Sequence, residues 1–121
     1  MVRIEQAVVI GASLAGLATA AVLAPRARRV TLIEARPAPS GTASIAPQGP
    51  APHLLLGGGR DALEAIYPGL AADLLAKGAS PACPANRRLW YHGYRARPHD
   101  DAYARQVAPL CTRGLLESTV R

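Results

Sequence analysis

Runs of apolar residues divide the start of the chain into a strand, a helix and a second strand. Residues 7–10 (AVVI) are wholly apolar and partly β-branched, as in a parallel strand covered on both faces. Residues 14–23 are rich in Ala and Leu and predict a helix, which Pro25 ends because proline cannot continue the hydrogen-bond ladder. Residues 30–34 (VTLIE) predict the second strand. These three elements within about 30 residues fit one right-handed βαβ crossover.

The rest of the chain predicts shorter elements and no repeat. Residues 35–52 are rich in Pro, Gly, Ser and Ala and predict an extended loop. Beyond it we predict helices at 60–67 and 70–77, and Gly78 ends the second of them. We also predict a hairpin of strands 89–91 and 94–97 around His92-Gly93. A strand at 107–112 and a helix that begins at Gly114 follow.

The predicted fold class is therefore α/β, a Rossmann-like βαβ segment with short helices and a small hairpin. With 121 residues, the chain is one domain or part of one. We expect residues 1–36 to form the βαβ unit and residues 37–121 to form a partial remainder of the same domain.

Composition limits the core that this chain can build. Half of the residues are hydrophobic, but there is no Phe, one Trp and one Met. Small aliphatic side chains bury little area each, so packing alone predicts modest stability. Cys83 and Cys111 have no partner at metal-ligand spacing, so we expect buried or unused thiols and no metal site.

Charge and hydropathy argue against two other classes of partner. The net charge of +6 comes from scattered arginines with few aromatic residues between them, so we predict solvated surface and no nucleic-acid interface. The uncharged run 7–24 has about the length of a membrane span, and Arg3 precedes it as in a signal peptide. Gly11 and Gly16 divide that run into strand, turn and helix. We therefore expect a cytoplasmic chain without stable membrane insertion, a signal or anchor being the alternative.

The turn between the first strand and the helix carries the predicted chemistry. It consists of Gly11, Ala12, Ser13, Leu14, Ala15 and Gly16, an approximate G-x-G-x-x-G with Ser in the second glycine position. Gly11 permits the tight turn, Ser13 adds one small group where the backbone approaches a pyrophosphate, and Gly16 lets the helix lie close to the strand. The unpaired N–H groups at the helix start then face the anion.

Glu34 completes this dinucleotide-binding pattern. It ends the predicted second strand, roughly 20 residues after Gly11, where a carboxylate accepts hydrogen bonds from the adenosine ribose hydroxyls. A carboxylate there repels a 2′-phosphate, which argues against NADP. In the structural alternative, the glycines serve packing alone and Glu34 is a solvated strand end.

The quoted motifs resemble one enzyme superfamily. The segment VVIGASLAGLATAAVLAPRARRVTLIEARP is similar to the N-terminus of FAD-dependent oxidoreductases of the aromatic-hydroxylase (flavoprotein monooxygenase) superfamily. The segments APQGPAPHLLLGGGRDALEAIYPGLAADLLAKGA, LWYHGYRARP and TRGLLESTVR resemble the following helices, the hairpin and the Arg-x-Leu-Leu-Glu helix start of a bacterial branch. The resemblance implies that residues 11–16 hold the FAD pyrophosphate, that Glu34 holds the ribose, and that Arg113 lies near the FAD.

The chain also departs from that family. The arginine that often follows the ribose-binding acid is replaced by Ala35, and we count Arg36, one position later, among the cofactor residues. Of an Arg-His-x-His pattern only His53 is kept, either as a site residue or as a loop histidine without a task. Three polar residues at positions 99–101 and His92 fit a solvated loop better than a catalytic set.

These features together predict FAD binding by the N-terminal segment of an FAD-dependent oxidoreductase. The resemblance implies a monooxygenase of a small organic substrate, with NAD(P)H as transient reductant. Because chains of that family run to several hundred residues, we expect a truncated product that supplies the adenosine half of the site and is inactive alone. The alternatives are a non-catalytic remnant, an NAD-binding protein, and a relative of flavin reductases or halogenases.

Overall fold

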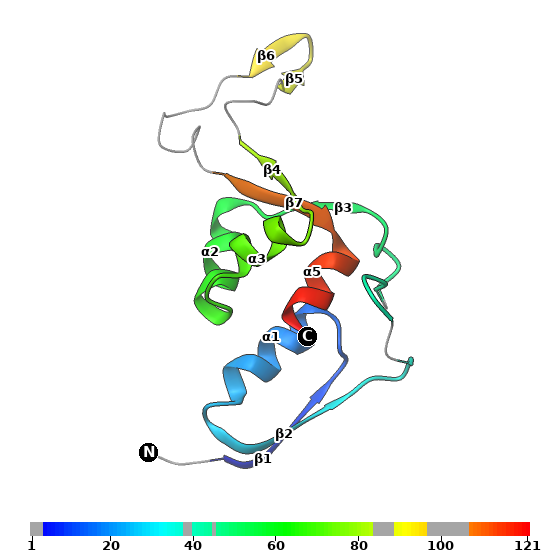
Figure 1. Ribbon diagram of the computed structural model, residues 1–121, viewed down its shortest axis with the longest axis vertical. Coiled ribbons are helices and arrows are strands. Elements are labelled where there is room, and N and C mark those ends of the chain that lie inside the picture. The colour runs from blue at the N-terminus through cyan, green and yellow to red at the C-terminus, as the bar shows by residue number, and fades with distance from the viewer. Residues whose placement is uncertain (1–3, 38–39, 45, 84–88, 97–106) are drawn as a thin grey trace.

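The computed structural model describes residues 4–37, 40–44, 46–83, 89–96 and 107–121. In chain order the elements are β1 (Ile4–Ile10), α1 (Leu14–Leu23), β2 (Ala27–Ile33), β3 (Pro52–Leu54), α2 (Gly57–Ile66), α3 (Leu70–Ala76), β4 (Ser80–Ala82), β5 (Leu89–Tyr91), β6 (Tyr94–Ala96), β7 (Ala108–Thr112) and α5 (Arg113–Val120) (Figure 1). The predicted α/β class is confirmed: a parallel βαβ unit is followed by short helices and small antiparallel sheets.

The βαβ unit has the predicted helix and longer strands than predicted. β1 and β2 pair in parallel, and α1 packs against one face of the pair (Figure 1). Both strands begin three residues earlier than predicted, because the ladder extends to Ile4, whose N–H donates to the Arg26 carbonyl at 3.1 Å. Arg28 and Arg29 do not interrupt β2, since both side chains are exposed.

Within the described residues, only one face of this parallel pair is covered. Val9 is buried on the side of α1, whereas Val8, Ile10 and Ile33 alternate with the covered positions and are exposed, Ile10 to 85%. A parallel sheet is ordinarily covered on both faces. The outer face of β1–β2, defined here by Val8, Ile10 and Ile33, is thus an apolar surface without cover in the described chain.

The second sheet is antiparallel, with β7 between β3 and β4. The sequence predicted β7 but neither β3 nor β4, because three-residue strands show no usable alternation and each contains a proline. Pro52 and Pro81 are tolerated because both strands lie at an edge. The predicted hairpin is confirmed as β5–β6. His92 and Gly93 have positive φ at its tip, as a two-residue type I′ turn requires.

The hydrophobic core lies between α3, β7 and α5. Its buried members are Leu70, Leu74, Ala79, Cys111 and Leu116. Partly buried side chains of α2 and the first residue of α1, Leu14, pack against it. The core is therefore aliphatic, as the composition predicted, and it reaches the start of α1.

Two helix starts differ from the prediction. α2 begins at Gly57, so that three consecutive glycines form its first turn. α5 begins at Arg113, one residue earlier than predicted, because the Thr112 hydroxyl accepts a hydrogen bond from the Leu115 N–H at 3.1 Å and caps the helix. Gly78 follows α3 with a φ of 100°, as a helix-ending glycine does.

The charge-free run at the start of the chain is not one helix. It is divided into β1, the turn at residues 11–13 and α1, as predicted. Among the described residues, no helix combines the length and the apolar character that a membrane crossing requires.

Candidate functional site

The turn between β1 and α1 depends on its two glycines. Gly11 has a φ of 96°, which favours glycine, and its N–H donates to the Ile33 carbonyl at 2.7 Å. Gly16 faces the carbonyl of Gly11 so closely that a Cβ at position 16 would overlap it. A Cβ built on Gly11 would meet nothing within 4 Å, so the space beside the turn is open to a ligand.

The start of α1 offers free backbone donors to that space. The N–H groups of Ser13, Ala15 and Gly16 donate no hydrogen bond within the described part of the chain. Ser13 is the N-cap residue, and its side chain makes no capping hydrogen bond. Free amides at a helix start, together with the helix dipole, favour a negatively charged group.

Glu34 points at this turn. Its Oε2 accepts a hydrogen bond from the Ala12 N–H at 2.8 Å, and its Oε1 accepts one from the Arg36 N–H at 3.1 Å. The hydrogen bonds from Ala12 and then Arg36 hold the pKa of Glu34 below its ordinary value. A carboxylate has about four acceptor positions, so Glu34 retains capacity for a further donor. Glu34 is therefore linked to the turn by a hydrogen bond.

Glu117 is a residue of this site that the sequence analysis did not single out. It is fully buried on α5, and its Oε1 accepts hydrogen bonds from the Leu14 N–H at 3.2 Å and from Arg113 Nε at 2.9 Å. Its Oε2 accepts one from the Ser44 hydroxyl at 2.6 Å. Burial raises the pKa of Glu117, but the bonds from Ser44, Arg113 and Leu14 outweigh it, so that this pKa lies below the ordinary value.

One signal in the sequence pointed to Glu117. It is the glutamate of the quoted RGLLE segment, four residues after Arg113, and residues at that spacing face each other on a helix. Only Arg113 was given a role from that segment. The contact with Leu14 joins positions 103 residues apart, and local spacing cannot reveal it.

Arg113 is the first residue of α5. It is connected to the start of α1 by Glu117, whose carboxylate accepts hydrogen bonds from both Arg113 and Leu14. Its Nε is bonded to that carboxylate, and its side chain is 22% exposed. Neither of its Nη groups donates to a described residue, so four of the five N–H donors of the guanidinium are available. The loop after β2 packs against the start of α5: a Cβ on Gly114 would overlap the Thr42 carbonyl, and the Gly114 N–H donates to the Gly49 carbonyl at 3.4 Å.

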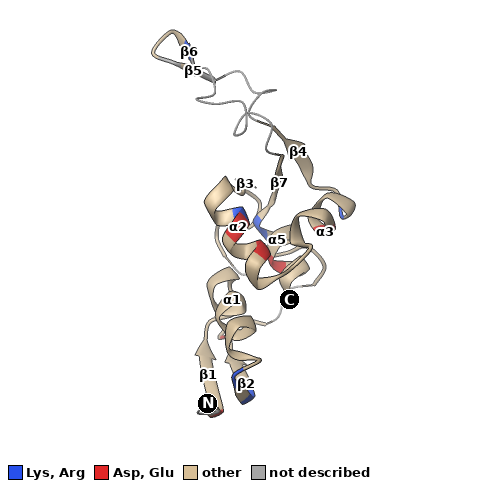
Figure 2. Ribbon diagram, turned by 90° about the vertical axis from the view of Figure 1, so that its left-hand side faces the viewer, with Lys and Arg blue, Asp and Glu red and all other residues tan. Residues whose placement is uncertain are grey.

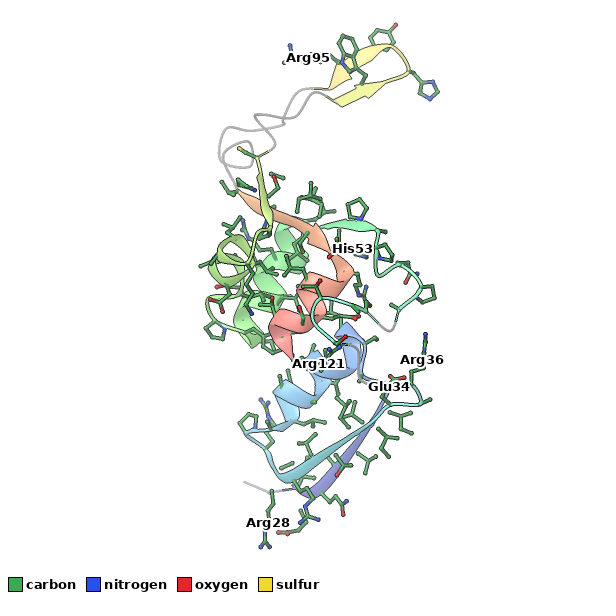
Figure 3. The ribbon with its side chains drawn as sticks, turned by 45° about the vertical axis from the view of Figure 1, so that its right-hand side comes forward. Arg28, Glu34, Arg36, His53, Arg95 and Arg121 are labelled. Carbon is green, nitrogen blue, oxygen red and sulfur yellow. The ribbon has the colours of Figure 1, made fainter. Side chains whose placement is uncertain are left out.

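The other residues considered lie in different surroundings. Arg36 is exposed beside Glu34, just beyond the end of β2 (Figure 3). His53 lies on β3 opposite Cys111, and its Nδ1 is 2.9 Å from the Ala51 carbonyl. Among the described residues, no hydrogen bond links His53 to the turn. His92 lies at the tip of the hairpin. The polar residues at positions 99–101 lie outside the described residues.

The two cysteines differ in burial: Cys111 is buried, whereas Cys83 is partly exposed. Neither Cys83 nor Cys111 forms a disulfide within the described residues, and burial raises the pKa of the Cys111 thiol, which favours its protonated form. No group of three His, Cys, Asp or Glu side chains among the described residues is placed to hold a metal ion.

A hollow of about 380 Å³ lies at the other end of β1–β2, where it is lined by Glu5, Gln6, Arg28 and Arg29. Figure 2 shows charged residues there, and Figure 3 shows Arg28 at the opposite end of the strands from Glu34. Arg28 and Glu5 approach to 3.5 Å, and both are largely exposed. Ligands of parallel sheets bind at the carboxyl ends of the strands, so the turn is the candidate site and the hollow is not.

Comparison with known proteins agrees with this geometry. Residues 9–60 match the family model of the NAD(P)-binding Rossmann-like domain. Protein Rv3254 of Mycobacterium tuberculosis is 40% identical over 76 residues, which are 61% of this chain and 16% of that protein. The chain thus spans a small part of the length of this curated relative. The turn, Glu34 and the loop that follows all fall inside the matched residues, and the N-terminal region is a Rossmann-like segment of the dinucleotide-binding type.

Proposed function

We propose that this chain binds FAD through the adenosine diphosphate half of the cofactor, as the N-terminal segment of an FAD-dependent oxidoreductase of the monooxygenase type. One observation carries the proposal: the Glu34 carboxylate lies 2.8 Å from the Ala12 N–H, beside a turn that leaves amides free. An acceptor for ribose hydroxyls and donors for a diphosphate are thereby held next to each other.

The described residues fit the adenosine diphosphate group. The free amides of Ser13, Ala15 and Gly16 would hold the diphosphate, and Glu34 would hold the ribose. Arg113 would add a guanidinium, which matches phosphate oxygens in a bidentate way. When bound, the isoalloxazine would supply redox chemistry with NAD(P)H and oxygen, whereas this chain supplies binding and orientation.

The choice of FAD rests on the resemblance to flavoprotein monooxygenases and on the position of Arg113. A second candidate is NAD, which the description of the matching family favours. Both dinucleotides share adenosine diphosphate, so the turn alone does not distinguish them. NADP is disfavoured whether the site takes FAD or NAD, because the ionised Glu34 would face the 2′-phosphate of NADP.

The test is a set of calorimetric titrations of the chain with FAD, NAD, NADP and ADP at fixed salt. We expect FAD and ADP to bind, NAD to bind more weakly than FAD, and NADP to bind weakest. Glu34→Ala should lower FAD affinity at least about tenfold, since two ribose hydrogen bonds to a charged acceptor are lost. Glu5→Ala, which removes an exposed carboxylate at the far end of β1, is the matched control and should bind FAD normally.

Two results would contradict the proposal. Binding of NAD without binding of FAD would assign the site to the second candidate. Equal effects of Glu34→Ala and Glu5→Ala would show that Glu34 does not contact the ligand.

A further inference from the structure

We propose that Glu117 is a positioning residue of the dinucleotide site, which acts through Arg113 on the cofactor diphosphate; this inference rests on the proposed function. Its carboxylate accepts hydrogen bonds from the first residue of α1, from the loop after β2 and from the start of α5. Leu14, Ser44 and Arg113 are its three partners.

Because Glu117 is fully buried, its carboxylate depends on the hydrogen-bond donors around it. A fully buried carboxylate is costly unless hydrogen bonds compensate it. Here three donors from three separate segments converge on its two oxygens, at 2.6 to 3.2 Å. Because each donor is held by its own backbone or helix, the carboxylate fixes the distance between α5 and the start of α1.

Arg113 is oriented as a consequence. Glu117 engages the Nε edge of the guanidinium, so rotation about the last side-chain bonds is restricted. The two Nη groups remain without a described partner, and together they form the planar fork that binds phosphate oxygens. Glu117 and the diphosphate would therefore bind opposite edges of one guanidinium, beside the amides of Ser13 and Ala15.

A merely structural role for Glu117 makes a different prediction. If it only tied α5 to α1, its loss would weaken the binding of every adenosine-containing ligand by the same factor. If it acts through Arg113, its loss should weaken ligands that carry a diphosphate and spare adenosine. Its effect should also vanish once Arg113 has been removed.

The experiment is a double-mutant cycle on the whole chain, with ADP and adenosine as probes. Glu117→Leu and Arg113→Gln should each lower ADP affinity about tenfold, and the double variant should also lose only about tenfold. Adenosine affinity should stay within about twofold of the wild type. Glu117→Gln should keep most ADP affinity, since its amide oxygen can accept from Leu14 and Arg113 while its NH₂ donates to Ser44.

Two further variants keep the test valid if Glu117→Leu fails to fold. Arg113→Lys retains the positive charge, but an ammonium group lacks the second planar edge with which a guanidinium would bind the diphosphate while Glu117 holds the first. This variant should therefore lose as much ADP affinity as Arg113→Gln. Glu64→Leu is the matched control, because Glu64 accepts hydrogen bonds from the Gly69 and Ala71 N–H groups in the α2–α3 region and should leave ADP affinity unchanged.

The outcomes separate this inference from the function on which it rests. Losses that multiply in the double variant, equal weakening of ADP and adenosine, or full affinity in Arg113→Lys would overturn the role of Glu117 while leaving dinucleotide binding intact. A wild-type chain that binds neither FAD nor ADP would overturn the proposed function and this inference with it.

Discussion

The βαβ unit and the α-helical region behind it are built on different principles. Within the described part of the βαβ unit, Val9 and Ala27 are the buried apolar residues. The α-helical region, defined here as α2, α3, β7 and α5, contains Leu70, Leu74, Cys111 and Leu116 in one buried cluster. The first region contains the glycine turn and Glu34, whereas the second contains most of the buried apolar side chains and also Arg113 and Glu117.

The difference shows how a thinly packed motif can keep a defined geometry. In the βαβ unit, polar contacts and close glycine contacts set the turn, through Glu34 on Ala12 and through Gly16 against Gly11. The α-helical region contributes the buried Glu117, which holds the start of α1 in place. The α-helical region thus supports the site through the contact of Glu117 with Leu14 and through the packing of Leu14 on the core.

The largest effect should come from the α-helical core. Leu74 is fully buried, so Leu74→Ala should lower the free energy of unfolding by about 2–5 kcal/mol. Urea unfolding followed by circular dichroism measures this loss. A cost below about 1 kcal/mol would contradict the assignment of the core to this region.

A glycine substitution tests the turn itself. Gly16→Ala places a Cβ against the Gly11 carbonyl, and overpacking of this kind costs about 1–3 kcal/mol. Because the turn must shift, FAD affinity should fall by at least about tenfold. In Gly58→Ala, the matched control on α2, the new Cβ meets nothing within 4 Å, so this variant should gain about 0.5–1 kcal/mol and bind FAD normally. Normal FAD binding by Gly16→Ala would show that the turn is not the site.

Acid should weaken the polar contacts that set the turn. The pKa values of Glu34 and Glu117 are both lowered in the folded chain. A lowered carboxyl pKa contributes stability above the unfolded value of about 4.3, and this contribution is lost as the pH falls through the folded value. Unfolding measured between pH 7 and pH 3 should show this loss. Glu117→Gln should make the pH dependence shallower, and an unchanged slope would argue against the compensated buried carboxylate.

The smallest effect is expected on the outer face of β1–β2. Ile10 is 85% exposed, so Ile10→Ala should change the free energy of unfolding by less than about 0.5 kcal/mol. The same urea titration measures this change. A loss as large as that of Leu74→Ala would show that the outer face is covered in solution, for instance by a second copy of the chain.

Local signals were sufficient for the βαβ unit. The helix at residues 14–23 was predicted with its bounds, because an Ala-rich run lies between a glycine turn and Pro25. The turn and the position of Glu34 beside it followed from spacing. The strands β3 and β4 were missed, because three residues that include a proline become a strand only when β7 supplies their hydrogen bonds.

The sequence by itself determined the strand–helix–strand order of the βαβ unit, the glycine turn and an aliphatic core without Phe, because backbone preference and periodicity act over a few residues. The tertiary structure decided what meets at the turn. Glu117 contacts Leu14, and Thr42 lies against Gly114, only because packing brings distant segments together. A buried carboxylate is defined by the donors that surround it, and two of the three donors here, Leu14 and Ser44, come from segments that no local pattern joins to α5.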